Sequence, residues 1–319
     1  PQEESLMIIT ITLNPAMDRT LRIEHPLVPN KLNRASSTSV EPGGKGINVS
    51  RALKAIGGES VALGFSAGTN GRSMKDALTS VDIHHDFVDV PGNTRVNLQI
   101  IDLDGNHTEI NEPGFKIADG DFLRFLERVE FYLDSQNIFV ISGSVPPGFP
   151  MHNFSELIKI IKKAGCRLIV DEPGDLMREA LKYEPDFVKP NIFELAELVG
   201  DEPTVDPDKL APSARKLLGM GAQAVCVSMG PEGALFISKR EPEVLYVNSN
   251  PKIYDEGAVG TGDAMVGAIA NAMDKNLSFV EMAKFTVATG RACARLAGTE
   301  MASLKRVYEV YESLLVYTV

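Results

Sequence analysis

Short apolar runs alternate with amphipathic stretches along almost the whole chain, and this alternation limits the possible folds more than any other feature. Met7–Leu13 is apolar or β-branched at every position, which is typical of a strand buried on both faces of a parallel sheet. Further strands are expected at Ser60–Ser66, Ile138–Ser142, Arg167–Asp171, Phe187–Lys189 and Ala224–Ser228. Strands linked by helices in this way predict an α/β fold with a doubly wound, mostly parallel sheet.

Helices are expected between these strands. The apolar residues Phe122, Phe125 and Val129 recur at helical spacing, as they would on a helix that covers a sheet. The expected helices are Lys45–Ile56, Asp121–Asp134, Phe154–Ala164 and Ile192–Val199, and a final helix with Tyr308, Tyr311 and Leu314–Leu315 on one face. Ser278 and Glu281 have the spacing of a capping box, which begins an Ala-rich helix that runs to about Leu296.

Two segments interrupt this alternation. Val96–Leu103 and His107–Asn111 are β-rich and flank Asp104-Gly105-Asn106, which predicts a hairpin. Thr20–Ser39 shows no helical period. We therefore expect residues 14–39 and 93–113 to form a small β-sheet lid over one α/β domain that comprises 7–13, 40–92 and 114–319. Met7 is the expected natural start of the chain.

Composition excludes several classes of protein. The 319 residues contain 32 Lys and Arg against 43 Asp and Glu, a net charge of −11. Without a basic run, nucleic acid and membrane surfaces are not expected partners, although a few local cations can still hold a small phosphorylated substrate. No apolar run approaches the roughly 20 residues of a membrane helix. Cys166, Cys226 and Cys293 lack metal or disulfide spacing, which indicates the cytoplasm.

The segment Gly260-Thr261-Gly262-Asp263 has the strongest chemical pattern. Glycines at a helix start allow a tight bend, and the N–H groups and dipole there attract an anion such as a transferring phosphoryl group. A carboxylate is a poor phosphate ligand, so Asp263 suits a base that accepts a proton from an attacking hydroxyl. A simple helix cap explains Asp263 equally well at this point.

A second glycine cluster, which contains Gly43, Gly44, Lys45 and Asn48, also precedes a helix. It lacks the spacing of a P-loop, and no dinucleotide-binding motif follows the first strand. Its glycines would let a polyol approach, with Lys45 and Asn48 as hydrogen-bond partners, although a plain turn remains an alternative.

Polar residues also follow two later strands. Asn191 and Glu194 lie three residues apart at a helix start, and Ser228 ends the next expected strand. Ligands bind at the carboxyl ends of strands in open parallel sheets. The oxygens of Asn191 and Glu194 suit Mg²⁺, held through water, whereas Glu194 alone is also a common surface residue near a helix N-terminus.

Taken together, these motifs and three others resemble the ribokinase-like sugar kinases of the phosphofructokinase B family over nearly all of Met7–Leu315. The matching segments, in chain order, are Thr12–Asp18, Gly43–Val49, Thr94–Asn97, Ser142–Gly148, Lys189–Asn191 with Glu194, and Gly260–Asp263.

The resemblance implies ATP-dependent phosphorylation of a sugar phosphate. It implies Asp263 as the base and Gly260, Thr261 and Gly262 as the anion hole. For the sugar phosphate it implies Asp18, Lys31, Gly43, Gly44, Lys45, Asn48, Arg95 and Asn97, with Arg95 on the phosphate that the sugar already carries. For ATP it implies Lys189, Asn191, Ser228, Gly230 and Gly233. It also implies Mg²⁺ near Asn191 and Glu194, a monovalent cation such as K⁺, and a homodimer that pairs through the lid.

Two features bear on the substrate. Glu41–Gly44, Lys31 and Arg51 resemble the minor-type 6-phosphofructokinases and favour fructose 6-phosphate, whereas Lys45 and Asn33 resemble the 1-phosphofructokinase and tagatose-6-phosphate kinase branch. Asp171-Glu172-Pro173-Gly174 departs from the family's Asp-Ser/Thr-Ser-Gly and adds a carboxyl near the substrate. The alternative from a different functional class is a sensor that binds a sugar phosphate without turning it over.

Overall fold

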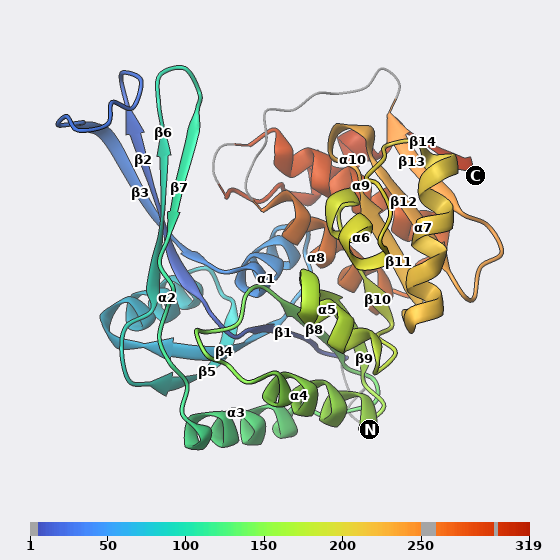
Figure 1. The fold of residues 1–319 in the computed structure, drawn as a ribbon, viewed down its shortest axis with the longest axis horizontal. Helices are drawn as coiled ribbons and strands as arrows, with labels where there is room; N and C mark the ends of the chain where they lie inside the picture. Colours follow the sequence, from blue (N-terminus) through green and yellow to red (C-terminus); the bar gives the residue numbers. More distant parts are fainter. Residues whose placement is uncertain (1–5, 250–259, 297–298) are drawn as a thin grey trace.

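The computed structural model describes residues 6–249, 260–296 and 299–319. A large sheet crosses the molecule, with helices on both faces (Figure 1). The residues that precede the expected start at Met7 lie, except for Leu6, outside the described residues. None of the helices in the described part of the chain has the length and apolar content needed to cross a membrane.

Within the described residues the large sheet has ten strands. Their order across the sheet is β14 (Leu314–Thr318), β13 (Leu245–Ser249), β12 (Ala234–Ser238), β11 (Ala224–Ser228), β10 (Phe187–Val188), β9 (Arg167–Asp171), β8 (Ile138–Ser142), β1 (Ile8–Thr12), β4 (Val61–Ala67) and β5 (His84–Val90). The strands from β11 to β5 pair in parallel, and β12 to β14 are antiparallel.

Alternate residues of the central strands enter two separate cores. On β8, Phe139 and Ile141 join the core on one face, whereas Ile138 and Val140 join the core on the other. One face carries α3 (Asp119–Phe131), α4 (Met151–Lys163), α5 (Gly174–Leu181), α6 (Ile192–Val199) and α7 (Pro207–Met220). The other carries α1 (Lys45–Ala55), α2 (Gly68–Ser80), α8 (Thr261–Asp274), α9 (Phe279–Ala294) and α10 (Leu304–Tyr311). The predicted doubly wound sheet is confirmed.

A small sheet extends from this body (Figure 1). Its order is β3 (Ala35–Gly43), β2 (Ala16–Ile23), β6 (Arg95–Ile101) and β7 (His107–Asn111). The predicted hairpin is confirmed, because β6 and β7 pair antiparallel across a turn in which Gly105 has φ +79°. β3 continues to Gly43, beyond the expected boundary at residue 39, since it pairs with β2 as far as Ala16.

One expected element is wrong in part. Tyr308 and Tyr311 belong to α10, but Leu314–Leu315 do not continue it and instead begin β14. β14 pairs with β13 at the edge of the large sheet, so tertiary pairing overrides the helical spacing of these residues. Helices α2, α5 and α7 are additional to the expected ones. The apolar faces of α2 and α5 are short, with three buried residues each, whereas α7 buries Leu210, Ala211, Ala214 and Leu217 at helical spacing, a signal that is visible in the sequence.

The start of α1 is fixed by close packing on β1. A Cβ atom at Gly46 would lie 2.4 Å from Thr12 Oγ1 and 2.7 Å from the Ile11 carbonyl oxygen. Only a glycine lets the first turn of α1 approach β1 this closely. The first turn of α1 includes Lys45, so this contact also positions a candidate site residue.

Gly46→Ala tests this packing against a matched helical glycine. We expect it to lower the free energy of unfolding by about 1–3 kcal/mol, because α1 must move away from β1. Gly120→Ala, in the first turn of α3, meets no atom within 4 Å and should stabilise by up to about 1 kcal/mol. Urea unfolding of both variants measures the difference. Equal effects would contradict the assigned contact.

Candidate active site

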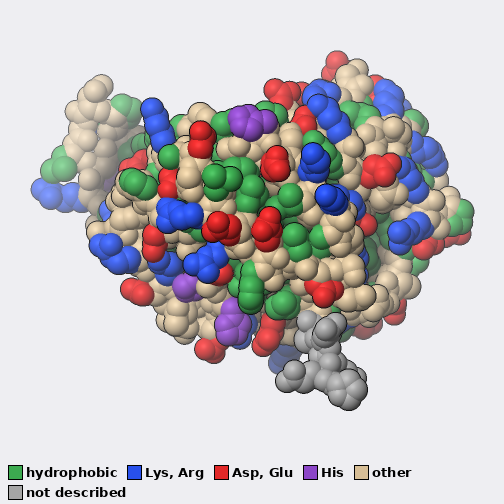
Figure 2. All heavy atoms as spheres, turned by 90° about the horizontal axis from the view of Figure 1, so that it is seen from below, with side chains coloured by type: hydrophobic (Ala, Val, Ile, Leu, Met, Phe, Trp, Pro, Cys, Tyr) green, Lys and Arg blue, Asp and Glu red, His purple; other side chains and the backbone are tan. Residues whose placement is uncertain are grey.

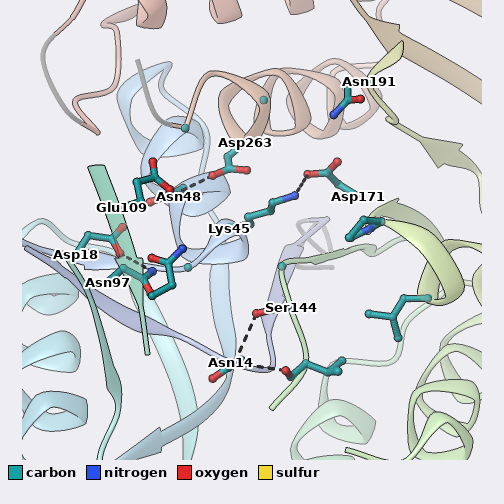
Figure 3. Close-up of a pocket in the computed structure, with 18 of the residues that line it drawn as sticks. Asn14, Asp18, Lys45, Asn48, Asn97, Glu109, Ser144, Asp171, Asn191 and Asp263 are labelled. Carbon is teal, nitrogen blue, oxygen red and sulfur yellow. Dashed lines mark hydrogen bonds and ion pairs between the residues drawn. The ribbon is translucent and has the colours of Figure 1, made fainter. Parts of the chain in front are cut away.

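A cleft of about 770 Å³ lies at the carboxyl edge of the large sheet. The ends of β1, β8, β9, β10 and β11 meet there, as strand ends do in an open parallel sheet. The N-termini of α1 and α8 enter it from one side, and the small sheet contributes residues of β2, β6 and β7 (Figure 3). Segments more than 200 residues apart in sequence therefore form a single cavity.

Most of the predicted site residues lie together in this cleft. Those that line it are Asp18, Gly44, Lys45, Asn48, Arg95, Asn97, Lys189, Asn191, Glu194, Ser228, Gly260, Gly262 and Asp263. Five do not line it. Gly43 packs beneath Asp18, Thr261 begins α8, and Gly230 and Gly233 form the turn after β11. Lys31 is exposed in the connection between β2 and β3.

The cleft also contains residues that were not predicted as site residues. They are Asn14, Gln99, Glu109, Asn111, Gly143, Ser144, Val145, Asp171, Pro173 and Leu176. A signal for part of this set is present in the sequence, because polar residues alternate along the hairpin. The register pairs Asn97 with Asn111 and Gln99 with Glu109, so these four side chains share one face of the small sheet.

Asp263 is positioned by two helix N-termini. It lies in the first turn of α8, which follows Gly260 at φ +90°, and it accepts a 2.9 Å hydrogen bond from Asn48 Nδ2 of α1 (Figure 3). Burial, and secondarily the charge of Asp171, raises the pKa of Asp263 to about 7, against the opposing effects of Asn48, Lys45 and Lys189. Asp263 is therefore able to accept a proton near neutral pH.

Two lysines balance the negative charge of Asp171. Lys189 Nζ lies 3.2 Å from Asp171 Oδ1, and Lys45 Nζ lies 3.7 Å from Oδ2. Burial opposes ionisation, but the two lysines outweigh it and lower the pKa of Asp171. The ammonium of Lys189 also lies 3.3 Å from where a Cβ atom of Gly262 would be, so a cation adjoins the first turn of α8. This arrangement favours an anion at that turn.

Glu172 follows Asp171 and is buried, with 3% of its surface exposed. Neither carboxyl oxygen has a hydrogen-bond partner among the described residues. Burial raises the pKa of Glu172 well above its ordinary range, and the charges of Asp171 and Glu194 add to this effect, against that of Lys45. The carboxyl that distinguishes this chain from the family pattern thus favours its uncharged form, so the added charge expected from the sequence is suppressed.

On the small-sheet side of the cleft, Asp18 accepts a 2.9 Å hydrogen bond from Asn97 Nδ2. Burial raises the pKa of Asp18, with the Asn97 bond and nearby arginines opposing. Arg95 donates to Ser144 Oγ at 3.1 Å and to the Asn14 carbonyl oxygen at 3.0 Å. The side chains predicted to bind sugar hydroxyl groups and a phosphate therefore line the same side of the cleft.

Asn191 and Glu194 form the capping box of α6. Asn191 Oδ1 accepts hydrogen bonds from the N–H groups of Phe193 and Glu194, and Glu194 Oε2 accepts one from the Asn191 N–H. The other carboxylate oxygen, Glu194 Oε1, takes no part in the capping box. No group of three or more acidic, His or Cys side chains in the described part of the chain is placed to hold a metal ion. A Mg²⁺ ion held by so few protein ligands would keep most of its water.

The parallel sheet, the small sheet and the cleft between them form a ribokinase-like architecture. The family model for the pfkB carbohydrate kinases matches residues 4–305. The chain is 36% identical over 288 residues to 1-phosphofructokinase of Bacillus subtilis, covering 90% of this chain and 92% of that protein. It is 34% identical over 310 residues to ATP-dependent 6-phosphofructokinase isozyme 2 of Escherichia coli, covering 96% and 98%. The chain belongs to the pfkB family of carbohydrate kinases.

Solved structures agree with this assignment. The Escherichia coli phosphofructokinase-2 in complex with substrates and products has a TM-score of 0.90 and 33% identity, covering 96% of this chain and 99% of that one. A possible 1-phosphofructokinase from Thermotoga maritima has a TM-score of 0.86 and 33% identity, covering 98% and 99%. Both kinds of phosphofructokinase therefore share the fold.

Glu172→Gln tests the uncharged carboxyl. Wild-type stability should fall as pH rises from the unfolded pKa of Glu172 toward its raised native pKa, because only the unfolded chain ionises there. Glutamine does not titrate. We expect the Tm of Glu172→Gln, relative to wild type, to increase by about 2 °C or more between about pH 5 and 8. Glu197→Gln, at an exposed position of α6, serves as the control. A pH-independent difference for Glu172→Gln would contradict the assignment.

Proposed function

We propose that this protein uses ATP to phosphorylate a ketohexose phosphate, with fructose 6-phosphate as the substrate and fructose 1,6-bisphosphate as the product. Asp263 accepts the proton of the attacking hydroxyl, whose oxygen bonds to the γ-phosphorus of ATP. The bond from that phosphorus to the β–γ bridging oxygen breaks, and ADP leaves. The placement of Asp263 carries the proposal, because a buried carboxyl at a helix N-terminus, with a pKa of about 7, lies beside a polar cleft.

The phosphoryl group is assigned to the first turn of α8. Gly260, Thr261 and Gly262 supply backbone N–H groups there, and the helix dipole adds positive potential. Lys189 provides a full positive charge beside Gly262. The transferring group thus lies between cationic groups and Asp263, which is the arrangement that phosphoryl transfer needs.

The nucleotide is assigned to the side of the cleft formed by β10, β11 and α6. Lys189, Asn191 and Ser228 line it, and Gly230 and Gly233 shape the turn that follows β11, with φ +56° and +100°. When Mg²⁺ is bound, it neutralises phosphate charge, and Glu194 would hold it through water.

We also propose a monovalent cation requirement, since the Escherichia coli phosphofructokinase-2 has been solved in complex with potassium.

The sugar phosphate is assigned to the small-sheet side. Four polar atoms of cleft residues are buried without a hydrogen-bond partner in the described structure: Asn14 Oδ1, Arg95 Nε, Asn97 Oδ1 and Gln99 Oε1. Buried polar groups nearly always have partners in native proteins, so a polar ligand explains this cluster. Gly43 leaves the space that the Asp18 carboxylate occupies, since a Cβ atom there would lie 2.2 Å from Asp18 Oδ2.

Within this subsite, Arg95 suits the phosphate of the sugar, because a guanidinium is planar and permanently charged. Asp18, Gly44 and Asn48 are assigned to hydroxyl groups of the sugar. Lys31, exposed and outside the cleft of this chain, stays a prediction as a substrate-binding residue.

We propose that the small sheet acts as a lid and pairs with that of a second subunit. Apolar side chains that are exposed on its strands and connections support this pairing: Val28, Leu32, Val40, Leu103 and Ile110. The Escherichia coli phosphofructokinase-2 has been solved as a tetramer in an inhibited form. By contrast, acidic and basic side chains are mixed over the helical face that Figure 2 shows.

We also propose a cytoplasmic location, supported by three cysteines that are buried and unpaired.

Two observations bear on the choice of sugar phosphate. Lys45, which resembles the 1-phosphofructokinase branch, extends to Asp171 and away from Asp18 and Asn97 (Figure 3). Lys45 therefore acts on the Asp263 side of the cleft rather than on the side that Asp18 and Asn97 form. The Glu41–Gly44 segment, which resembles the minor-type 6-phosphofructokinases, lies directly beside Asp18. The contact with the sugar subsite thus favours fructose 6-phosphate.

Asp263→Asn tests the assignment of the base. We expect kcat to fall by about 10²–10⁴-fold, because an amide cannot accept the hydroxyl proton. Sugar-phosphate binding, measured by calorimetry, should change little. Turnover close to wild type would overturn the role of Asp263. A wild-type protein that binds the sugar phosphate without releasing ADP would instead be a sensor.

A panel of substrates tests the specificity. We expect fructose 6-phosphate to have a higher kcat/KM than fructose 1-phosphate and tagatose 6-phosphate at matched Mg²⁺ and ATP concentrations. ADP release, followed with a coupled assay, measures each value. A higher value for either competitor would overturn the proposed substrate and leave the kinase assignment intact.

A further inference from the structure

Arg51 lies outside the cleft and contacts three separate segments. It is on α1, three residues after Asn48, so both side chains share one face of the helix. Arg51 Nη2 donates to Glu41 Oε2 of β3 at 2.9 Å. Arg51 Nη1 donates to Thr299 Oγ1 at 3.1 Å and to Asn48 Oδ1 at 3.4 Å. Thr299 also donates to Glu41 Oε2.

These contacts determine the orientation of the Asn48 amide. Asn48 lies between the Arg51 guanidinium, which only donates hydrogen bonds, and the Asp263 carboxylate, which only accepts them when ionised. The oxygen of Asn48 must therefore face Arg51, and its NH₂ group must face Asp263. The reversed amide would place donor against donor and acceptor against acceptor. Asn48 is 4% exposed, so water cannot replace the lost partners easily.

We propose that Arg51 is a positioning residue for the catalytic carboxylate, which it holds through Asn48, and that its ion pair with Glu41 links this orientation to the small sheet. The proposal rests on the proposed role of Asp263 as the base. Arg51 does not line the cleft, so its effect on catalysis is indirect.

The contact between Arg51 and Asn48 affects the pH dependence of activity through the pKa of Asp263. The groups that act on Asp263 are Asp171, Lys45 and Lys189, together with the Asn48 hydrogen bond. The Asn48 bond lowers the pKa of Asp263 against the effect of burial. Without Arg51, the amide is free to turn, the bond weakens and the pKa rises. Because the base must be ionised, activity is then lost at low pH and recovered at high pH.

Arg51→Met removes every donor and keeps the apolar stem. We measure kcat/KM between about pH 5.5 and 9. We expect the acidic limb of this profile to shift to higher pH by about half to one unit. That corresponds to roughly 3–10-fold lower activity on the acidic side and a small change above the limb. Asn48→Ala should show the same movement. The double variant should show no more than either single variant, because both act on one hydrogen bond.

Arg167→Met provides a matched control. Arg167 donates to the carbonyl oxygens of Met273 and Gln136, both at 3.0 Å, near the amino-terminal ends of β8 and β9. Its loss should lower Tm and leave the pH profile in place. Arg51→Lys keeps the charge but cannot reach Glu41 and Asn48 together, so it should move the limb in the same direction even if Arg51→Met fails to fold.

Three results would overturn the inference. The first is an acidic limb of Arg51→Met or Arg51→Lys that coincides with that of wild type. The second is a double variant in which the pH shifts of Arg51→Met and Asn48→Ala add. The third is a shift of the acidic limb in Arg167→Met as large as that in Arg51→Met. Each outcome would show that Arg51 has only a structural role. Failure of the base assignment gives a different result, since Asp263→Asn would then retain turnover whatever Arg51 does.

Discussion

The hydrogen bond from Asn48 to Asp263 is the contact on which the proposed chemistry depends. It joins the first turns of α1 and α8, which are separated by 215 residues in the sequence. Each helix begins at a glycine with positive φ, Gly44 and Gly260. The N-termini of both helices lie at the carboxyl edge of the sheet, where their positive potential acts on the Asp263 carboxylate.

Charge compensation makes this arrangement possible. Asp171 and Asp263 are both nearly buried, and two adjacent buried carboxylates would be strongly destabilising without counter-charges. Lys189 and Lys45 keep Asp171 ionised, whereas Asp263, with the weaker partner Asn48, has its pKa near 7. Environment thus gives the two aspartates different roles. Glu172, which is also buried, avoids an uncompensated charge because its raised pKa favours the uncharged form.

The small sheet contributes residues that the large sheet cannot supply. Arg95, Asn97 and Gln99 point into the cleft from β6, and Asp18 from β2. The Glu41–Arg51 ion pair joins β3 of the small sheet to α1, the helix that carries Asn48. The proposed sugar subsite and the proposed base are therefore linked by a chain of direct contacts through Glu41, Arg51 and Asn48.

The sequence by itself determined the alternation of strands and helices, the hairpin, and the motifs that carry Asp263, Asn48 and Lys189. Buried parallel strands need continuous apolar residues, and helix starts need glycine or capping side chains, and both requirements are visible locally. Only the tertiary structure decided that Leu314 and Leu315 enter a strand, that Asn48 lies against Asp263, and that Arg51 contacts Thr299. These outcomes depend on partners distant in the chain, and the periodicity of one segment contains no information about them.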